Sequence, residues 1–190
     1  MTRWNLFGML TLIVAIFALT ASATAPDRVE SLQHAIRATA RTSFVLFLPV
    51  FLATSFARIV PSALTRALAR ERRYIGLSFA ASQFLHAIVL IIYIRTAPEA
   101  FWVGRTPVTN IPGLIGYLMI LLLTLTSFAT PASLIGPANW KKLHLAGVWI
   151  LAVIFAASFL TRVHQHAAYL VPGMVMVVAM LFRMAERFEA

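Results

Sequence analysis

Long apolar runs separated by short polar stretches follow one another along the whole chain. Each run is about 20 residues long, which at about 1.5 Å of rise per residue matches the hydrocarbon thickness of a bilayer. The runs are continuous rather than alternating with polar residues, a pattern typical of helices and not of a transmembrane β-barrel. The sequence therefore predicts an all-α polytopic membrane protein, a six-helix transmembrane bundle that forms one domain over residues 1–190. The predicted spans are 4–24, 43–59, 75–94, 112–132, 143–161 and 168–182.

Composition supports the membrane assignment and sets the expected orientation. Mean hydropathy is +0.85 and 12% of the residues are charged. The net charge of +10 comes from basic residues between the predicted spans, which favours lipid headgroups over nucleic acid as the partner. Cytoplasmic N- and C-termini place ten basic residues inside and six outside, as the positive-inside rule prefers. We therefore expect a multi-pass protein of the inner (plasma) membrane.

The most basic connection precedes the third span. Arg66, Arg70 and Arg73 follow one another at spacings of four and three, so a short helix would present them on one face, with Arg72 beside them. This pattern predicts an anchor on anionic lipid. The alternative hypothesis is a docking surface for a cytoplasmic partner or a phosphorylated cofactor such as a flavin nucleotide.

Two other segments carry specific expectations. The connection 96–111 contains Trp102 and several prolines, and it predicts a rigid extended cap on the outer face. The first span ends in Ala21-Ser22-Ala23, which resembles a signal-peptide cleavage site, but we favour a retained helix.

Few side chains in the predicted spans can do chemistry. The chain has no cysteine, which excludes disulfides, thiolate metal sites and iron–sulfur clusters. None of the six carboxylates is predicted to lie in a span, and Arg183 and Glu186 are assigned to a tail after residue 182. His86 and His144 lie in apolar runs, where an ionisable residue is a candidate functional group. Paired His164 and His166 in an outer connection make only a weak metal motif.

Two short patterns carry a family resemblance. The first is Arg72-Arg73-Tyr74-Ile75-Gly76-Leu77 followed by Phe84-Leu85-His86. The second is Thr126-Ser127, a short loop, and then Trp140-Lys141-Lys142-Leu143-His144. Together they resemble the ferric-reductase-like transmembrane domain superfamily over about residues 41–160. The nearest branch is the heme-binding membrane subunit of the periplasmic methionine sulfoxide reductase system. The resemblance implies a b-type heme between helices, with His86 and His144 matching family histidines, and electron transfer from quinol or flavin across the membrane.

The chain departs from the family at one heme ligand. The family's further histidine, thirteen residues after His144, falls on Ala157. Counted from the nearest basic residues, His86 lies about 20 Å and His144 about 3 Å from the cytoplasmic boundary, so the two form a poor axial pair. Ala157 would lie about 22 Å deep, level with His86. Met119 and Met174 are the other candidate partners for a heme iron on His86, and five-coordinate iron on His86 alone is also open.

Two functions therefore remain open from the sequence. One is an electron-transfer subunit with one b-type heme on His86, whose catalytic partner is another membrane or periplasmic protein. The other is a heme-free structural or assembly subunit of a larger membrane complex. In the second, His86 would be satisfied by Gln83 or by hydroxyls of the fourth span, and His144 would be an interfacial residue contacting headgroups or a neighbouring loop. Whether the chain is part of an enzyme stays undecided at this stage.

Overall fold

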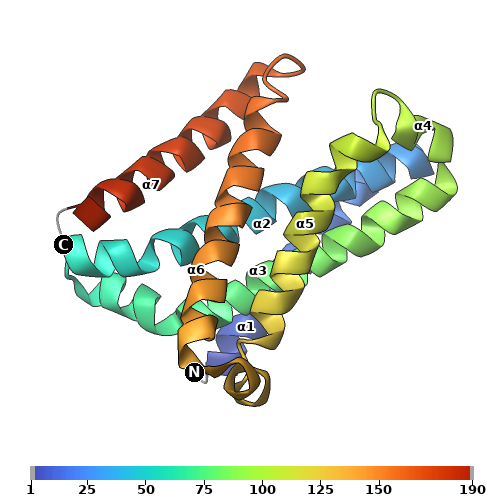
Figure 1. Cartoon of the computed structure of the whole chain (residues 1–190). Coiled ribbons are helices and arrows are strands. Elements are labelled where there is room, and N and C mark those ends of the chain that lie inside the picture. The colour runs from blue at the N-terminus through green and yellow to red at the C-terminus, as the bar shows by residue number, and fades with distance from the viewer. Residues whose placement is uncertain (1–2, 189–190) are drawn as a thin grey trace. The chain divides into compact units, whose positions relative to one another are not determined.

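A computed structural model describes residues 3–188, with side chains described through Glu186. Helices account for almost all of this part of the chain, and it contains no strand. The elements in chain order, labelled in Figure 1, are α1 (Arg3–Ala23), α2 (Arg28–Ile59), α3 (Ala63–Thr96), α4 (Pro98–Trp102), α5 (Pro107–Leu125), α6 (Ala129–Leu160), the 3-10 turn η1 (Ala167–Tyr169) and α7 (Leu170–Phe188).

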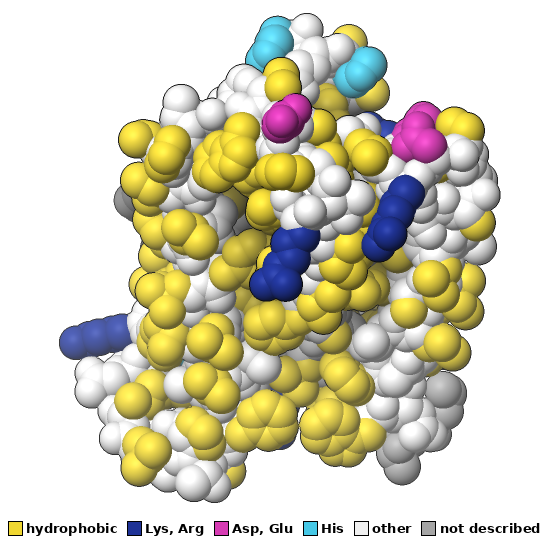
Figure 2. Space-filling model, turned by 90° about the vertical axis from the view of Figure 1, so that its right-hand side faces the viewer, with side chains coloured by type: hydrophobic (Ala, Val, Ile, Leu, Met, Phe, Trp, Pro, Cys, Tyr) yellow, Lys and Arg dark blue, Asp and Glu magenta, His cyan; other side chains and the backbone are white. Residues whose placement is uncertain are grey.

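Six of the described helices are long and apolar enough to cross a bilayer, which confirms the predicted fold class. The six are α1, α2, α3, α5, α6 and α7, the last counted as Ala167–Glu186. The exposed side chains on these helices are largely apolar, as lipid contact requires, and Figure 2 shows one such face. The chain is therefore an integral, multi-pass membrane protein by the physical properties of its helices.

Helices α2 and α3 begin well before their predicted spans. Helix α2 starts at Arg28 because Asp27 caps it: Asp27 Oδ1 accepts the backbone N–H of Glu30 at 2.8 Å. Helix α3 starts at Ala63, so the arginine-rich segment is part of this helix and not a separate short one. At about 1.5 Å per residue both helices are longer than a bilayer is thick, so each extends beyond the hydrocarbon.

The prediction of an extended cap over residues 96–111 is wrong. The segment forms α4 and the first turn of α5, and each of these helices has a proline at its start, Pro98 and Pro107. Proline is favoured at the first helical position because its fixed φ suits a helix and its missing N–H has no partner there. At the start of α5, the hydroxyl oxygen of Thr109 accepts the backbone N–H of Thr106, and the hydroxyl oxygen of Thr106 accepts the backbone N–H of Thr109.

Helix α6 contains a break at Gly136, in the stretch 133–142 that the sequence analysis left between two predicted spans. Gly136 has φ +73°, in the left-handed region where a Cβ is disfavoured, and Pro137 follows it as the first residue of the long segment that carries His144. The stretch from Ala129 to the glycine is helical as well.

The chain divides into two compact units. The first contains the chain up to Phe47 together with Glu71–Ile111, and thus α1, most of α2 and α3, and α4. The second contains Leu48–Arg70 and the chain from Pro112, and thus the remaining parts of α2 and α3 together with α6 and α7 and most of α5. We describe each unit separately.

Each unit has its own aromatic packing. In the first, Trp4 meets Tyr74 edge to face, with ring centroids 5.3 Å apart, and Phe47 packs on Phe79 at 5.2 Å. In the second, Phe51 meets Trp149 at 5.3 Å, and Met176 of α7 is completely buried. Of these side chains, Tyr74, Phe47, Phe51, Phe79 and Met176 are buried.

Candidate functional site

His86 is held from the neighbouring helix in the first unit. Its Nδ1 lies 2.9 Å from Oγ1 of Thr39, which is fully buried on α2. The His86 ring itself is half-buried on α3. We had predicted Gln83 or hydroxyls of the fourth span as partners, whereas the structure supplies a hydroxyl from the second span. The sequence did not indicate this partner because Thr39 precedes the span predicted at 43–59.

The Thr39–His86 contact belongs to a longer row of polar contacts between α2 and α3, which we call the α2–α3 polar seam. Its shortest side-chain pairs are Gln33–Tyr93 at 2.9 Å, Thr39–His86 at 2.9 Å and Ser43–Ser82 at 2.8 Å. Residue numbers rise on α2 as they fall on α3, so the two helices run antiparallel here. Two residues of these pairs are titratable, the His86 imidazole and the Tyr93 phenol. Such hydroxyl and amide contacts hold membrane helices together, each contributing about 0.6 kcal/mol on average.

His144 is fixed by a different set of contacts in the second unit. Its Nε2 lies 2.9 Å from Oγ1 of Thr126, just after α5, and its ring stacks on Trp140 with centroids 4.3 Å apart. The indole N–H of Trp140 donates to the Thr126 backbone carbonyl at 2.8 Å. His144 thus ties the start of the long α6 segment to the end of α5, through a threonine that lies inside the fourth predicted span, 112–132.

The other candidate heme ligands lie in the second unit. Met119 is half-buried on α5, whereas the side chain of Met174 on α7 is 48% exposed. Ala157, at the position of the family histidine, is exposed on α6. His86 lies in the first unit, so the structure describes these positions and His86 in separate units.

The second unit contains buried charge that the sequence analysis placed in a tail. Helix α7 continues past residue 182, and Arg183 and Glu186 are 9% and 8% exposed. Arg183 Nη1 donates to the Phe51 carbonyl at 2.8 Å, and its guanidinium stacks 4.5 Å above the Phe51 ring. Glu186 pairs with Arg58 of α2, Oε1 to Nη1 at 3.0 Å.

The assignment of Glu186 to a tail outside the spans is therefore wrong. The signal that could have shown this is the three-residue spacing of Arg183 and Glu186, which places both on one face of a continuing helix. Glu189, assigned to the same tail, lies outside the described residues. The indole N–H of Trp149, next to the Phe51 ring, is buried without a hydrogen-bond partner among the described residues.

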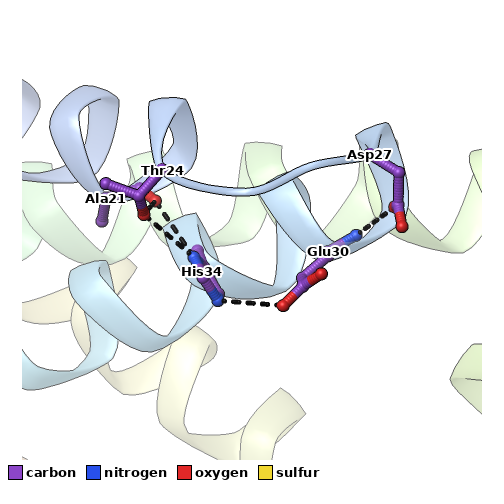
Figure 3. Close-up of polar contacts among 5 residues, drawn as sticks. All are labelled: Ala21, Thr24, Asp27, Glu30 and His34. Carbon is purple, nitrogen blue, oxygen red and sulfur yellow. Dashed lines mark hydrogen bonds and ion pairs between the residues drawn. The ribbon is translucent and has the colours of Figure 1, made fainter.

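A cluster of polar contacts where α1 meets α2 holds the His34 ring, as Figure 3 shows. Its Nδ1 lies 3.2 Å from the Ala21 carbonyl and 3.3 Å from Thr24 Oγ1, and its Nε2 lies 3.6 Å from a carboxylate oxygen of Glu30. Together with Arg3–Glu71 at 3.7 Å and Trp4–Tyr74, these contacts fasten both ends of α1 to the first unit.

The basic residues of α3 and the outer histidines lie at the surface. Arg66, Arg70 and Arg73 are exposed, and Arg72 is half-buried. His164 and His166 are exposed in the turn between α6 and α7. Among the described residues, no three histidine or carboxylate side chains gather as a metal site.

The helices and these sites define the class of the chain, a multi-pass helical membrane protein in which His86 and His144, one in each compact unit, each contact a buried threonine hydroxyl. Comparison with protein-family models, curated proteins and solved structures found no significant match.

Proposed function

We propose that this chain is a ferric-reductase-like membrane electron-transfer subunit that carries one b-type heme on His86. The observation that supports this most directly is the His86–Thr39 pair. An imidazole inside an apolar helix is oriented by a fully buried hydroxyl that contacts the nitrogen opposite the usual ligating atom. Heme, when bound, supplies one-electron chemistry at an iron whose potential is tuned by its axial ligands.

The residues present fit this heme through one ligand. His86 offers Nε2 on a ring that is half-buried and held at Nδ1. His144 fits less well, because its Nε2 is already engaged by Thr126. Met119 remains a candidate second ligand, and Met174, with its exposed side chain, is the weaker one. In this proposal His86 holds the iron and the apolar side chains of the helices exclude water.

The proposed electron acceptor or donor is another membrane or periplasmic protein. We further propose that the N- and C-termini face the cytoplasm in the inner (plasma) membrane, because this orientation places the basic start of α3 inside. Exposed Arg66, Arg70 and Arg73 would then contact anionic headgroups, each contributing about 1 kcal/mol near the surface.

Reduced-minus-oxidised spectroscopy of the purified chain in detergent tests the heme. We expect a Soret band in the wild-type protein and in His164→Ala, whose histidine is exposed outside the site, and loss of the band in His86→Ala. A colourless preparation that is well folded by circular dichroism would overturn the heme proposal.

Two observations favour a second candidate, a heme-free structural or assembly subunit of a larger membrane complex. Ala157 carries no ligand at the family's heme position, and His144 is bonded to Thr126. This alternative predicts that the colourless chain migrates on native gels with a larger assembly when extracted from its own membrane. Migration of a heme-loaded chain by itself would count against it.

A further inference from the structure

The contacts of the two membrane histidines specify which ring nitrogen carries the proton in each. A neutral imidazole has one N–H and one lone pair, and its hydrogen-bond partners decide between the two tautomers. Both histidines here are bonded to a threonine hydroxyl, but through opposite nitrogens: His86 through Nδ1 and His144 through Nε2.

The direction of the His86 bond follows from what the Thr39 hydroxyl does with its single proton. Thr39 Oγ1 lies 2.8 Å from the Ala35 carbonyl and 3.1 Å from the Ile36 carbonyl, both one turn earlier on α2. Two oxygen atoms 2.8 Å apart repel unless a proton lies between them, so the hydroxyl donates to the helix backbone. Thr39 then has only lone pairs to offer His86, and His86 Nδ1 must be the donor.

The same argument gives the opposite result for His144. Thr126 Oγ1 lies 2.7 Å from the Leu122 carbonyl, so it donates there and accepts from His144 at 2.9 Å. The proton of His144 is therefore on Nε2 and its lone pair is on Nδ1. Both threonines are largely buried, at 0% and 7% exposure, so water does not compete strongly for either hydroxyl.

We propose that Thr39 is a positioning residue that holds His86 as the Nδ1–H tautomer with its lone pair on Nε2, while Thr126 holds His144 as the Nε2–H tautomer. Heme iron binds the lone pair of a neutral imidazole, in most cases at Nε2, with the other nitrogen donating to an outer partner. His86 thus has its lone pair on the nitrogen that heme iron usually binds, whereas the lone pair of His144 is on Nδ1. The tautomers are independent of any cofactor, whereas the role of Thr39 toward iron rests on the proposed heme.

Nitrogen-15 NMR of histidine-labelled protein in detergent, at a pH where both rings are neutral, tests the tautomers directly. His86→Gln and His144→Gln assign the resonances. We expect His86 to show a protonated Nδ1 and an unprotonated Nε2, and His144 to show the reverse. Finding His86 protonated at Nε2 in the wild-type protein would overturn the proposal.

Thr39→Val keeps the side-chain shape and removes the acceptor. We expect it to lower the ratio of the Nδ1–H to the Nε2–H tautomer at His86 roughly fivefold or more, with His144 unchanged. Thr39→Ser should restore the wild-type ratio, and Thr42→Val, which alters a hydroxyl one turn away, should leave it unchanged. An unaltered His86 ratio in a folded Thr39→Val protein contradicts the assignment of Thr39.

The same variants separate this inference from the heme proposal. If the wild-type chain carries heme, Thr39→Val should shift its midpoint potential, because the ligand loses its outer hydrogen bond, and Thr39→Ser should not. If the chain is colourless, the heme proposal fails while the nitrogen resonances still decide the tautomers. A heme-loaded chain with unshifted potential in Thr39→Val would retain the proposed function and reject the positioning role.

Discussion

Both membrane histidines, His86 and His144, are held in place by a threonine hydroxyl. Sequence analysis identified the imidazoles, because a histidine in an apolar run is conspicuous, but it could not select their partners. Thr126 belongs to the same sequence pattern as His144, but the pattern does not say which atom its hydroxyl contacts, and Thr39 looks like many other hydroxyls in the chain until the helices are packed. Their importance lies in burial and in the atom that each one faces.

The Thr126 contact predicts a local stability effect. Thr126→Val removes the acceptor for the His144 ring while Trp140 can still donate to the backbone carbonyl at this position. We expect unfolding in detergent to become easier by about 1 kcal/mol, the usual net value of such a bond. Thr124→Val is the matched control, because the Thr124 hydroxyl donates to Ile120 within its own helix at 2.7 Å. Equal losses in both variants would show that the His144 bond contributes nothing.

The Arg58–Glu186 pair predicts an asymmetric response to substitution. Arg58→Ala leaves the buried carboxylate of Glu186 without this partner, which is costly, whereas Glu186→Gln leaves an arginine that water can reach. We expect Arg58→Ala to lower the unfolding midpoint more than Glu186→Gln does, and the double variant to lose less than the sum of the two. Additive losses in this double-mutant cycle would argue against a coupled pair.

At the scale of elements, glycine decides how closely α7 approaches α6. A Cβ added at Gly173 would lie 2.7 Å from Leu160 Cδ2 and 3.1 Å from Leu160 Cγ, so the Leu160 side chain would have to move to admit it. Small residues at membrane helix contacts allow this kind of approach.

Gly173→Ala should therefore destabilise the α6–α7 contact by about 1–2 kcal/mol through overpacking. The matched control is Gly113→Ala in α5, where an added Cβ meets nothing within 4 Å and alanine should be neutral or slightly stabilising. Thermal unfolding of the two variants in the same detergent measures the difference. The packing argument fails if Gly173→Ala is as stable as Gly113→Ala.

The first residues of the helices were the features hardest to predict from the sequence. Hydropathy identifies where a chain can cross lipid, but α2 and α3 continue into water, where capping and tertiary contacts decide their length. The Asp27 cap and the helix-starting prolines of the 96–111 segment are local signals that a hydropathy window averages away.

At the scale of the whole molecule, six spans require both termini to lie on the same side of the membrane. The absence of native cysteine allows a clean test by labelling of single introduced cysteines. We expect Ala63→Cys and Asn139→Cys to react from the cytoplasmic side, and Glu99→Cys and Gln165→Cys to react from the opposite side, since all four positions are exposed. Reaction of Ala63→Cys and Glu99→Cys from one side would refute the six-span topology, and a reversed pattern would refute only the orientation.

The sequence by itself determined that this chain is a six-span helical membrane protein, because burial in lipid depends on the length and polarity of each run and on little else. It also identified His86 and His144 as the unusual groups. Only the tertiary structure decided what holds them, which nitrogen of each ring meets a hydroxyl, and that Arg183 and Glu186 are buried. Those facts depend on which helix faces pack together, and such packing joins residues far apart in the chain, as Thr39 joins His86.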